Sequence, residues 1–260
     1  MKRTWMFGIP TILLGVFSPD AEASTLHEWT LHERSAPLQI DGQHLANQVF
    51  FLDLGVQSID RLNPVTGELE EWHPSTFVGG TPSSIEVDEA ASPPVVFVSD
   101  PSSQQIGRLA PPNVYSYWPV AIPPIYQLRV LAVERVTGNV LFTSYDGVHA
   151  PVVASFDPAR GTGRACILPP DAGEPSDRLD GIVALPSPAT APVLKAYFSV
   201  VGTKHRSIDL LDFSASTVTV WPVPLVDAGQ IALTKTGQIA SVLDGASSIA
   251  QLLDTSLSKY

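Results

Sequence analysis

Cysteine is almost absent from this sequence, since Cys166 is the only one in 260 residues. A disulfide within the chain and a zinc site built from thiolates are therefore excluded. Cys166 stands between Ala165 and Ile167 in an alternating pattern. This pattern predicts a small, buried hydrophobic side chain in a strand.

Positive charge is also scarce, with 15 Lys and Arg against 26 Asp and Glu and a formal net charge of -11. An acidic protein gains nothing from contact with phosphate groups, so the composition argues against nucleic acid as a partner. Helical periodicity is missing as well. The 24 Pro and 18 Gly fall between short apolar runs, which is typical of strands joined by tight turns and predicts an all-β fold.

A long hydrophobic run occurs only at the N-terminus, where Lys2 and Arg3 precede an apolar stretch over residues 5–17 and an Ala-Glu-Ala site at residues 21–23. This order predicts a secretory signal peptide over residues 1–23, although an uncleaved membrane anchor is the alternative. The expected mature chain is then a single domain over residues 24–260, secreted or periplasmic. It has no further stretch long enough to span a membrane.

The most informative positive feature is a sequence pattern that occurs four times. A strand with Phe is followed by an Ile-x-x-Leu strand or its counterpart, and then by a strand that ends in Trp-Pro or a similar pair. The aligned residues are Phe51, Phe97, Phe142 and Phe198, at intervals of 46, 45 and 56, with Ile167 in the third copy where the others have Trp. An interval of this length with four short strands is typical of one β-propeller blade.

A fifth, incomplete copy follows, with strands expected around residues 231–233, 239–244 and 249–252. The segment around Trp29 resembles the Trp strand of the first copy but has no blade of its own. We therefore predict a propeller of five four-stranded blades, in which the N-terminal strand completes the last blade and closes the ring. The turns at Gly67 and Gly161 are expected to need a positive φ. The protein is expected to be a monomer.

Several motifs carry a family resemblance. The sequence IDRLNPVTGELEEW over residues 59–72, the motif IGRL over residues 106–109, and Pro-x-x-Ile before the first two Phe strands resemble the virginiamycin B lyase (streptogramin lyase-like) β-propeller family. The likeness runs from Trp29 to the C-terminus. It implies a metal-assisted elimination that opens a cyclic depsipeptide at its ester, using magnesium with histidines and a glutamate at the mouth of the central channel.

In that family the catalytic histidines follow the proline that opens a blade. The matching positions here hold Leu38, Ser83, Ile125 and Ser176. Because no histidine remains to act as a general base, loss of the lyase reaction is predicted. Glu174 before Pro175 is the candidate catalytic residue that the resemblance leaves. The six histidines of the chain, including the loop residues His44, His149 and His205, are interpreted as surface residues.

Four carboxylates recur near the ends of second strands, namely Asp53, Asp100, Asp146 and Asp244. If they converge, their oxygens suit a hard cation such as magnesium or calcium. The alternative is that they are turn residues, since Asp commonly ends a strand.

The function predicted first is a binding module, with a small molecule, peptide or protein held on one face of the disc. The alternative is a metal-dependent carbon–oxygen lyase, or a lactone or ester hydrolase, acting at the channel mouth through Glu174 and the aspartates. A third interpretation is a structural protein that assembles through an exposed apolar patch.

Overall fold

The computed structural model describes residues 11–15, 26–31, 33–43, 48–74, 80–110, 114–120, 127–186, 194–202, 204–222, 227–233, 239–244 and 250–253. These residues form strands and turns and contain no helix. In particular, no described helix is long and apolar enough to cross a membrane. The chain divides into a first unit, residues 1–79, and a second unit, residues 80–260. The division into a signal peptide and one domain stays a prediction.

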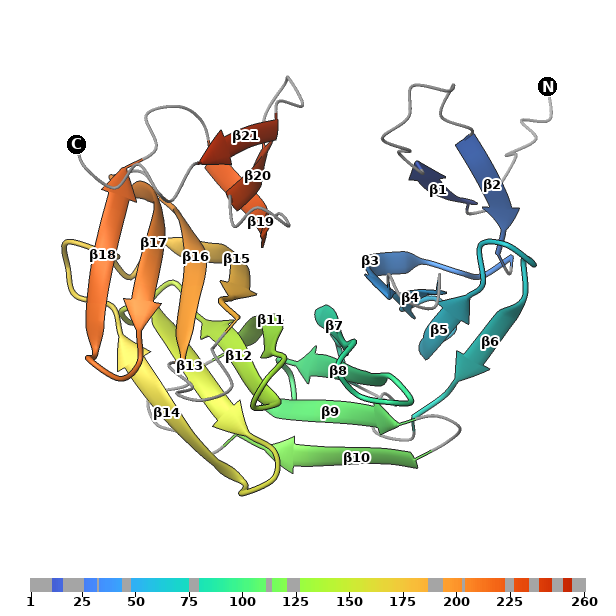
Figure 1. Ribbon diagram of the computed structural model, residues 1–260. Coiled ribbons are helices and arrows are strands. Elements are labelled where there is room, and N and C mark those ends of the chain that lie inside the picture. Colours follow the sequence, from blue (N-terminus) through green and yellow to red (C-terminus); the bar gives the residue numbers. More distant parts are fainter. Residues whose placement is uncertain are drawn as a thin grey trace, which may run out of the picture. The chain divides into compact units, whose positions relative to one another are not determined.

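The first unit contains a two-stranded and a four-stranded antiparallel sheet (Figure 1). The small sheet pairs β1 (Thr11–Gly15) with β2 (Leu26–Thr30). The first four-stranded sheet, called the first sheet below, has its strands in chain order: β3 (Pro37–Gln43), β4 (Gln48–Asp53), β5 (Ser58–Leu62) and β6 (Leu69–Trp72).

The second unit contains four more antiparallel sheets, each built from consecutive strands. The second sheet has β7 (Ser84–Asp88), β8 (Val95–Asp100), β9 (Gln105–Ala110) and β10 (Val114–Pro119). The third has β11 (Leu128–Glu134), β12 (Asn139–Ser144), β13 (Val152–Asp157) and β14 (Thr162–Ile167). The fourth has β15 (Arg178–Ala184), β16 (Lys195–Val201), β17 (Arg206–Asp212) and β18 (Thr217–Pro222). The fifth has β19 (Asp227–Leu233), β20 (Ile239–Asp244) and β21 (Ala250–Leu253).

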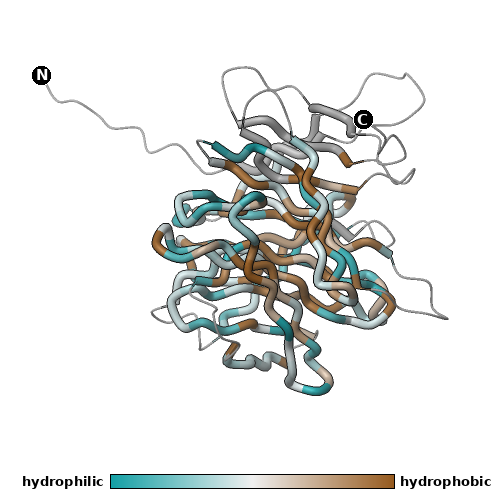
Figure 2. Tube along the Cα trace, turned by 90° about the vertical axis from the view of Figure 1, so that its left-hand side faces the viewer, coloured by the Kyte–Doolittle hydropathy of each residue, from teal (hydrophilic) through white to brown (hydrophobic). Residues whose placement is uncertain are grey.

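The sheets of the second unit pack on one another in chain order. Their first strands are in contact, β7 with β11, β11 with β15, and β15 with β19. Between the second and third sheets, Phe97 and Ile106 share a buried cluster with Phe142. Between the third and fourth, Leu141 packs with Phe198. Figure 2 shows the hydrophobic colour concentrated along the strands and the hydrophilic colour at the turns, as expected where both faces of a sheet are covered.

Side chains that cap the turns end the strands where the sequence changes from apolar to polar. Asn63 accepts the N–H groups of Val65 and Thr66, and the turn closes at Gly67 with a φ of 74°. Asp157 and Gly161 repeat the arrangement in the third sheet, where φ is 64°. The predicted positive φ at both glycines is confirmed.

The pairing registers correct one part of the Phe alignment. Phe51 lies opposite Asp60, and Phe142 and Phe198 lie opposite the equivalent residues, Ala154 and Asp209. In the second sheet, however, the residue opposite Gly107 is Val98. Phe97 is therefore one register position away, and because strand side chains alternate it belongs to the opposite face. All four phenylalanines are buried.

The Trp alignment is corrected in the same way. Trp72 and Trp221 pair with Ile59 and Ile208, and their counterpart in the third sheet is Cys166, opposite Val153. Ile167 is 54% exposed and is not the replacement for Trp. Cys166 packs against the cluster between the third and fourth sheets, and burial raises the pKa of its thiol. The predicted packing in a strand agrees with this position, but the side chain is half-buried and not fully buried as predicted.

Closure of the ring by the N-terminal strand would join the first unit to the second and stays a prediction. β2 pairs with β1, with Trp29 opposite Ile12, and the fifth sheet has three strands. Trp29 packs against a buried cluster that includes Phe51 and Leu62 of the first sheet. β1 lies inside the predicted signal peptide, so the pairing of β1 with β2 exists only in a chain that keeps residues 1–23.

Candidate functional site

The carboxylates at the ends of β4 and β8 hold the backbone of their own sheets. One oxygen of Asp53 accepts the N–H of Gly55 at 2.9 Å and that of Ala36, which precedes β3, at 2.7 Å. Asp100 accepts the N–H of Ser102 at 3.0 Å and that of Thr81, which precedes β7, at 3.3 Å. Within its own sheet, each side chain therefore links the loop that follows the second strand to the loop that precedes the first strand.

The third sheet makes the same link with a hydroxyl group, since Ser144 accepts the N–H of Gln127 at 3.1 Å. Asp146, two residues later, caps its own loop through the N–H groups of Val148 and His149, each at 2.9 Å. Its other oxygen lies 2.8 Å from Nδ1 of His149. The backbone N–H and the ring of His149 lower the pKa of Asp146 to about 2.

These contacts favour the turn interpretation of the predicted metal candidates. Asp53, Asp100 and Asp146 each bind backbone N–H groups, while the side chain of Asp244 lies outside the described residues. No group of three His, Cys, Asp or Glu able to hold a metal ion occurs in the described part of the chain. Burial alone would raise the pKa of Asp100, but hydrogen bonds from Ser102, Ser103 and Thr81 bring it below its ordinary value.

The fourth sheet makes the link with a carboxylate and a histidine. Val200 occupies the position of Asp53, because it pairs with Ser207 as Asp53 pairs with Ser58. The acceptor comes instead from Asp177, before β15, which is fully buried. Its Oδ2 accepts the N–H of Glu174 at 2.7 Å and lies 2.9 Å from Nδ1 of His205, in the loop before β17.

Gly202 makes room for this carboxylate. A Cβ atom at Gly202 would lie 1.7 Å from Oδ1 of Asp177, so no larger residue fits without movement. The predicted catalytic residue Glu174 lies beside the pair, and its side chain forms an ion pair with Lys204 at 2.9 Å. The residues that sequence reasoning missed are Asp177 and His205. The available signal was that the fourth copy alone has none of the recurring aspartates near the end of its second strand.

The other positions of the family motif hold no catalytic group. Leu38 is 52% exposed on β3, and Ser83 contacts the Ser99 hydroxyl at 3.1 Å. Ser176 is exposed, and Ile125 lies outside the described residues.

An Asp–His pair has a recognised chemical use. The carboxylate fixes the orientation of the ring through Nδ1 and leaves Nε2 to bind or move a proton. The side chain of His205 is 22% exposed, which leaves the ring partly accessible to solvent. The pair is therefore a candidate for acid–base chemistry, and it is more buried than the other Asp–His pair, Asp146 with His149.

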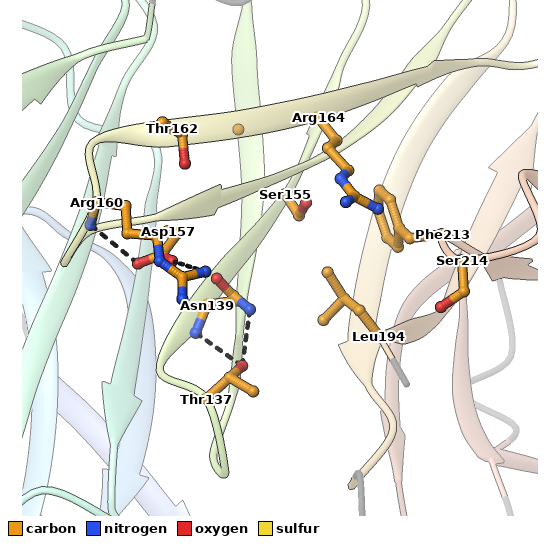
Figure 3. A pocket seen from close by; sticks show the side chains of 11 residues that line it. Thr137, Asn139, Ser155, Asp157, Arg160, Thr162, Arg164, Leu194, Phe213 and Ser214 are labelled. Atoms are coloured by element: carbon orange, nitrogen blue, oxygen red, sulfur yellow. Dashed lines mark hydrogen bonds and ion pairs between the residues drawn. The ribbon is translucent and has the colours of Figure 1, made fainter. Parts of the chain in front are cut away.

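A pocket of about 580 Å³ lies at the opposite ends of the strands, between the third and fourth sheets. Figure 3 shows its lining. The third sheet contributes Thr137, Asn139, Ser155, Asp157, Arg160, Thr162, Gly163 and Arg164, and the fourth contributes Leu194, Phe213 and Ser214. Its position was not predicted, because it depends on how two sheets diverge at their turns.

Comparisons by sequence find nothing, since no family model and no curated protein matches the chain. Solved structures do match. A streptogramin B lyase aligns with a TM-score of 0.65 at 16% identity, over 85% of this chain and 66% of that chain. This chain therefore spans about two thirds of that lyase.

A catalytically inactive variant of virginiamycin B lyase from Staphylococcus aureus, solved with quinupristin, aligns with a TM-score of 0.64 at 12% identity. This alignment covers 95% of the present chain and 78% of the lyase chain. A chain of the nidogen–laminin complex gives a TM-score of 0.66 at 12% identity, over 90% and 84% of the two chains. At such low identities these matches establish the fold: the chain is a β-propeller that resembles virginiamycin B lyase and related propeller proteins.

Proposed function

We propose that this protein is a secreted β-propeller that works as a binding module, with its ligand in the pocket between the third and fourth sheets. The observation that carries the proposal is the pocket itself, with its volume of about 580 Å³ and its mixed polar and apolar lining. Ligand sites in proteins are concave, combine apolar walls with a few convergent polar groups, and span this range of volume.

The strand-end contacts support a binding role over the lyase reaction. Asp53 and Asp100 bind backbone N–H groups of their own sheets, and no histidine stands at the blade-opening positions. The structural neighbours include lyases and a protein from a binding complex. The propeller fold therefore accommodates either kind of function, and the local groups decide between them.

Ligand-observed NMR with a fragment library tests the pocket. Ser214 lines it and is exposed, so Ser214→Trp should fill the opening, whereas Ala215→Trp places the same ring one residue away, outside the lining. We expect fragments that bind the wild type and Ala215→Trp but not Ser214→Trp. A library with no such fragment would overturn the proposal for this pocket.

Secretion has a separate test. The proposed cleavage before Ser24 predicts that the exported protein begins at this residue, which N-terminal sequencing would show. An exported protein that keeps residues 1–23 would contradict the cleavage.

A second candidate function is a lyase or hydrolase at the Asp177–His205 pair, favoured by the 2.9 Å contact and by Glu174 beside it. Turnover of cyclic depsipeptides, lactones or esters should be measured with and without magnesium, for the wild type and for His205→Gln. Wild-type turnover that His205→Gln removes from a folded protein would replace the binding proposal. No turnover of these substrates would remove this candidate function.

A further inference from the structure

We infer that the pocket takes a small organic anion, with its carboxylate, sulfate or phosphate group held by Arg164 and Arg160 and its apolar part against Leu194 and Phe213. This inference rests on the proposed function and gives the chemical class of its ligand. Figure 3 shows Arg164 reaching from β14 toward Phe213 of the neighbouring sheet.

The lining has an excess of positive charge in a protein whose net charge is -11. Two of its side chains are arginines, and Asp157 is its only carboxylate. Asp157 uses Oδ1 to accept the N–H groups of Ala159 and Arg160, at 2.9 and 3.2 Å. Its Oδ2 lies 3.5 Å from the Arg160 guanidinium, an exposed pair of small energetic weight.

Arg164 has no carboxylate partner within the part of the chain that the structure describes. The nearby turn carboxylates are already engaged. Glu134 accepts two hydrogen bonds from Thr137, at 2.8 Å from N–H and 2.6 Å from the hydroxyl. Asp212 accepts the N–H of Ser214 at 2.8 Å and pairs with Lys195 at 3.0 Å. The guanidinium of Arg164 is thus available to a ligand.

The chemistry of guanidinium selects the ligand. Its planar set of N–H donors matches the two oxygens of a carboxylate, or two oxygens of a sulfate or phosphate. Ser155 and Thr162 add hydroxyl groups to the same lining. The fourth sheet supplies the apolar side chains of Leu194 and Phe213 beside the exposed Ser214, and these two suit the apolar part of a ligand.

Benzoate and its neutral analogue benzamide, which is nearly the same in shape, test the inference by titration calorimetry or NMR. Benzoate should bind the wild type about tenfold more tightly or better, as expected for hydrogen bonds to a charged group. Arg164→Gln removes the charge but keeps a donor, and it should abolish the preference. Arg178→Gln removes the same charge from an exposed arginine outside the pocket and should preserve it.

The outcomes separate the inference from the proposed function. If benzamide binds as tightly as benzoate, and Ser214→Trp blocks both, the pocket binds ligands but the anion inference fails. A preference for benzoate that Arg178→Gln lowers as much as Arg164→Gln does would also overturn the inference, because only net charge would matter. If neither probe nor any fragment is blocked by Ser214→Trp, the proposed binding function fails.

Discussion

The second and fourth sheets join the same two loops with different chemical groups. In the second sheet, Asp100 reaches from the end of β8 to the N–H of Thr81. In the fourth, the carboxylate comes from the other loop, where Asp177 accepts the N–H of Glu174 and contacts His205. The link is kept because backbone N–H groups that leave water need an acceptor. The residue that supplies the acceptor can change.

This exchange gives the two sheets different chemical capacities. Asp100 is occupied by backbone and hydroxyl donors and offers little to a ligand. Asp177 orients an imidazole ring that still has a second nitrogen. The link in the fourth sheet therefore holds a titratable imidazole ring at one position of a repetitive fold. Unfolding free energies of variants measure how much this link contributes to stability.

The largest effect is expected for Asp177→Ala, which removes a fully buried carboxylate and leaves the Glu174 N–H and the His205 ring without their partner. Leaving two hydrogen-bond partners of a buried carboxylate unpaired in this way should cost about 3 kcal/mol of unfolding free energy. Denaturant unfolding at neutral pH measures it. A cost below about 1 kcal/mol, the worth of one neutral hydrogen bond, would show that the link is dispensable.

Gly202→Ala provides the control for this interpretation. In the wild type the new methyl group meets Oδ1 of Asp177, so the variant should lose stability. In the Asp177→Ala background the obstacle is gone, and the cost should largely disappear. Additive costs in the double variant would place the strain elsewhere.

A second prediction concerns the buried acid that the fourth sheet carries and the second sheet lacks. Asp209 stands at the register position of Gly107, and burial raises its pKa to about 7. Between the unfolded pKa, near 3.8, and about 7, the folded protein keeps a proton that the unfolded chain has released. Stability should therefore fall as pH rises through this window, by about 1.4 kcal/mol per pH unit for this group.

Asp209→Asn should remove that slope, so the variant gains about 2 kcal/mol relative to the wild type between pH 5 and pH 8. Unfolding free energies at several pH values measure it. Asp60 in the first sheet, with its pKa raised by burial to about 7, should respond in the same way. Parallel pH profiles for variant and wild type would contradict the prediction.

A third, smaller effect is expected for Asp100→Ala, about 1.5 kcal/mol from the loss of hydrogen bonds to a charged group. The pKa of Asp100 is lowered in the fold, so its contribution is present above its unfolded pKa and is lost as pH falls through the folded value. The matched control is Asp88→Ala, which removes a half-buried carboxylate that accepts the N–H of Ala90, two residues away. Equal costs for the two variants would show that the link to Thr81 adds nothing.

The sequence predicted the sheets well and the candidate site less well. The repeats predicted the strands, including those of the fifth sheet, because alternation and turn residues are local signals. It was harder to predict which residues occupy equivalent positions in different repeats. Phe97 and Ile167 each stand one residue from the predicted register, and one residue reverses the face of a strand.

The candidate site was less predictable for a physical reason. Asp177 and His205 lie 28 residues apart and meet only when β15 and β17 take their places in one sheet. His205 therefore looked like a lone loop histidine. The recurring aspartates were visible in the sequence, but whether they bind a cation or a backbone N–H depends on distances that only the fold sets.

The smallest effect is expected for Ser144→Ala, which tests whether the third sheet depends on the same link. Ser144 accepts the N–H of Gln127 at 3.1 Å through an uncharged hydroxyl, and losing it should cost about 1 kcal/mol. Ser214→Ala, at an exposed serine, is the control and should change stability little. Because no charge is involved, the loss of stability should be the same at pH 5 and pH 8. The effect of Asp209→Asn, in contrast, should depend on pH. A cost that equals the control would show that water replaces the hydroxyl, and that the link matters only where it is charged.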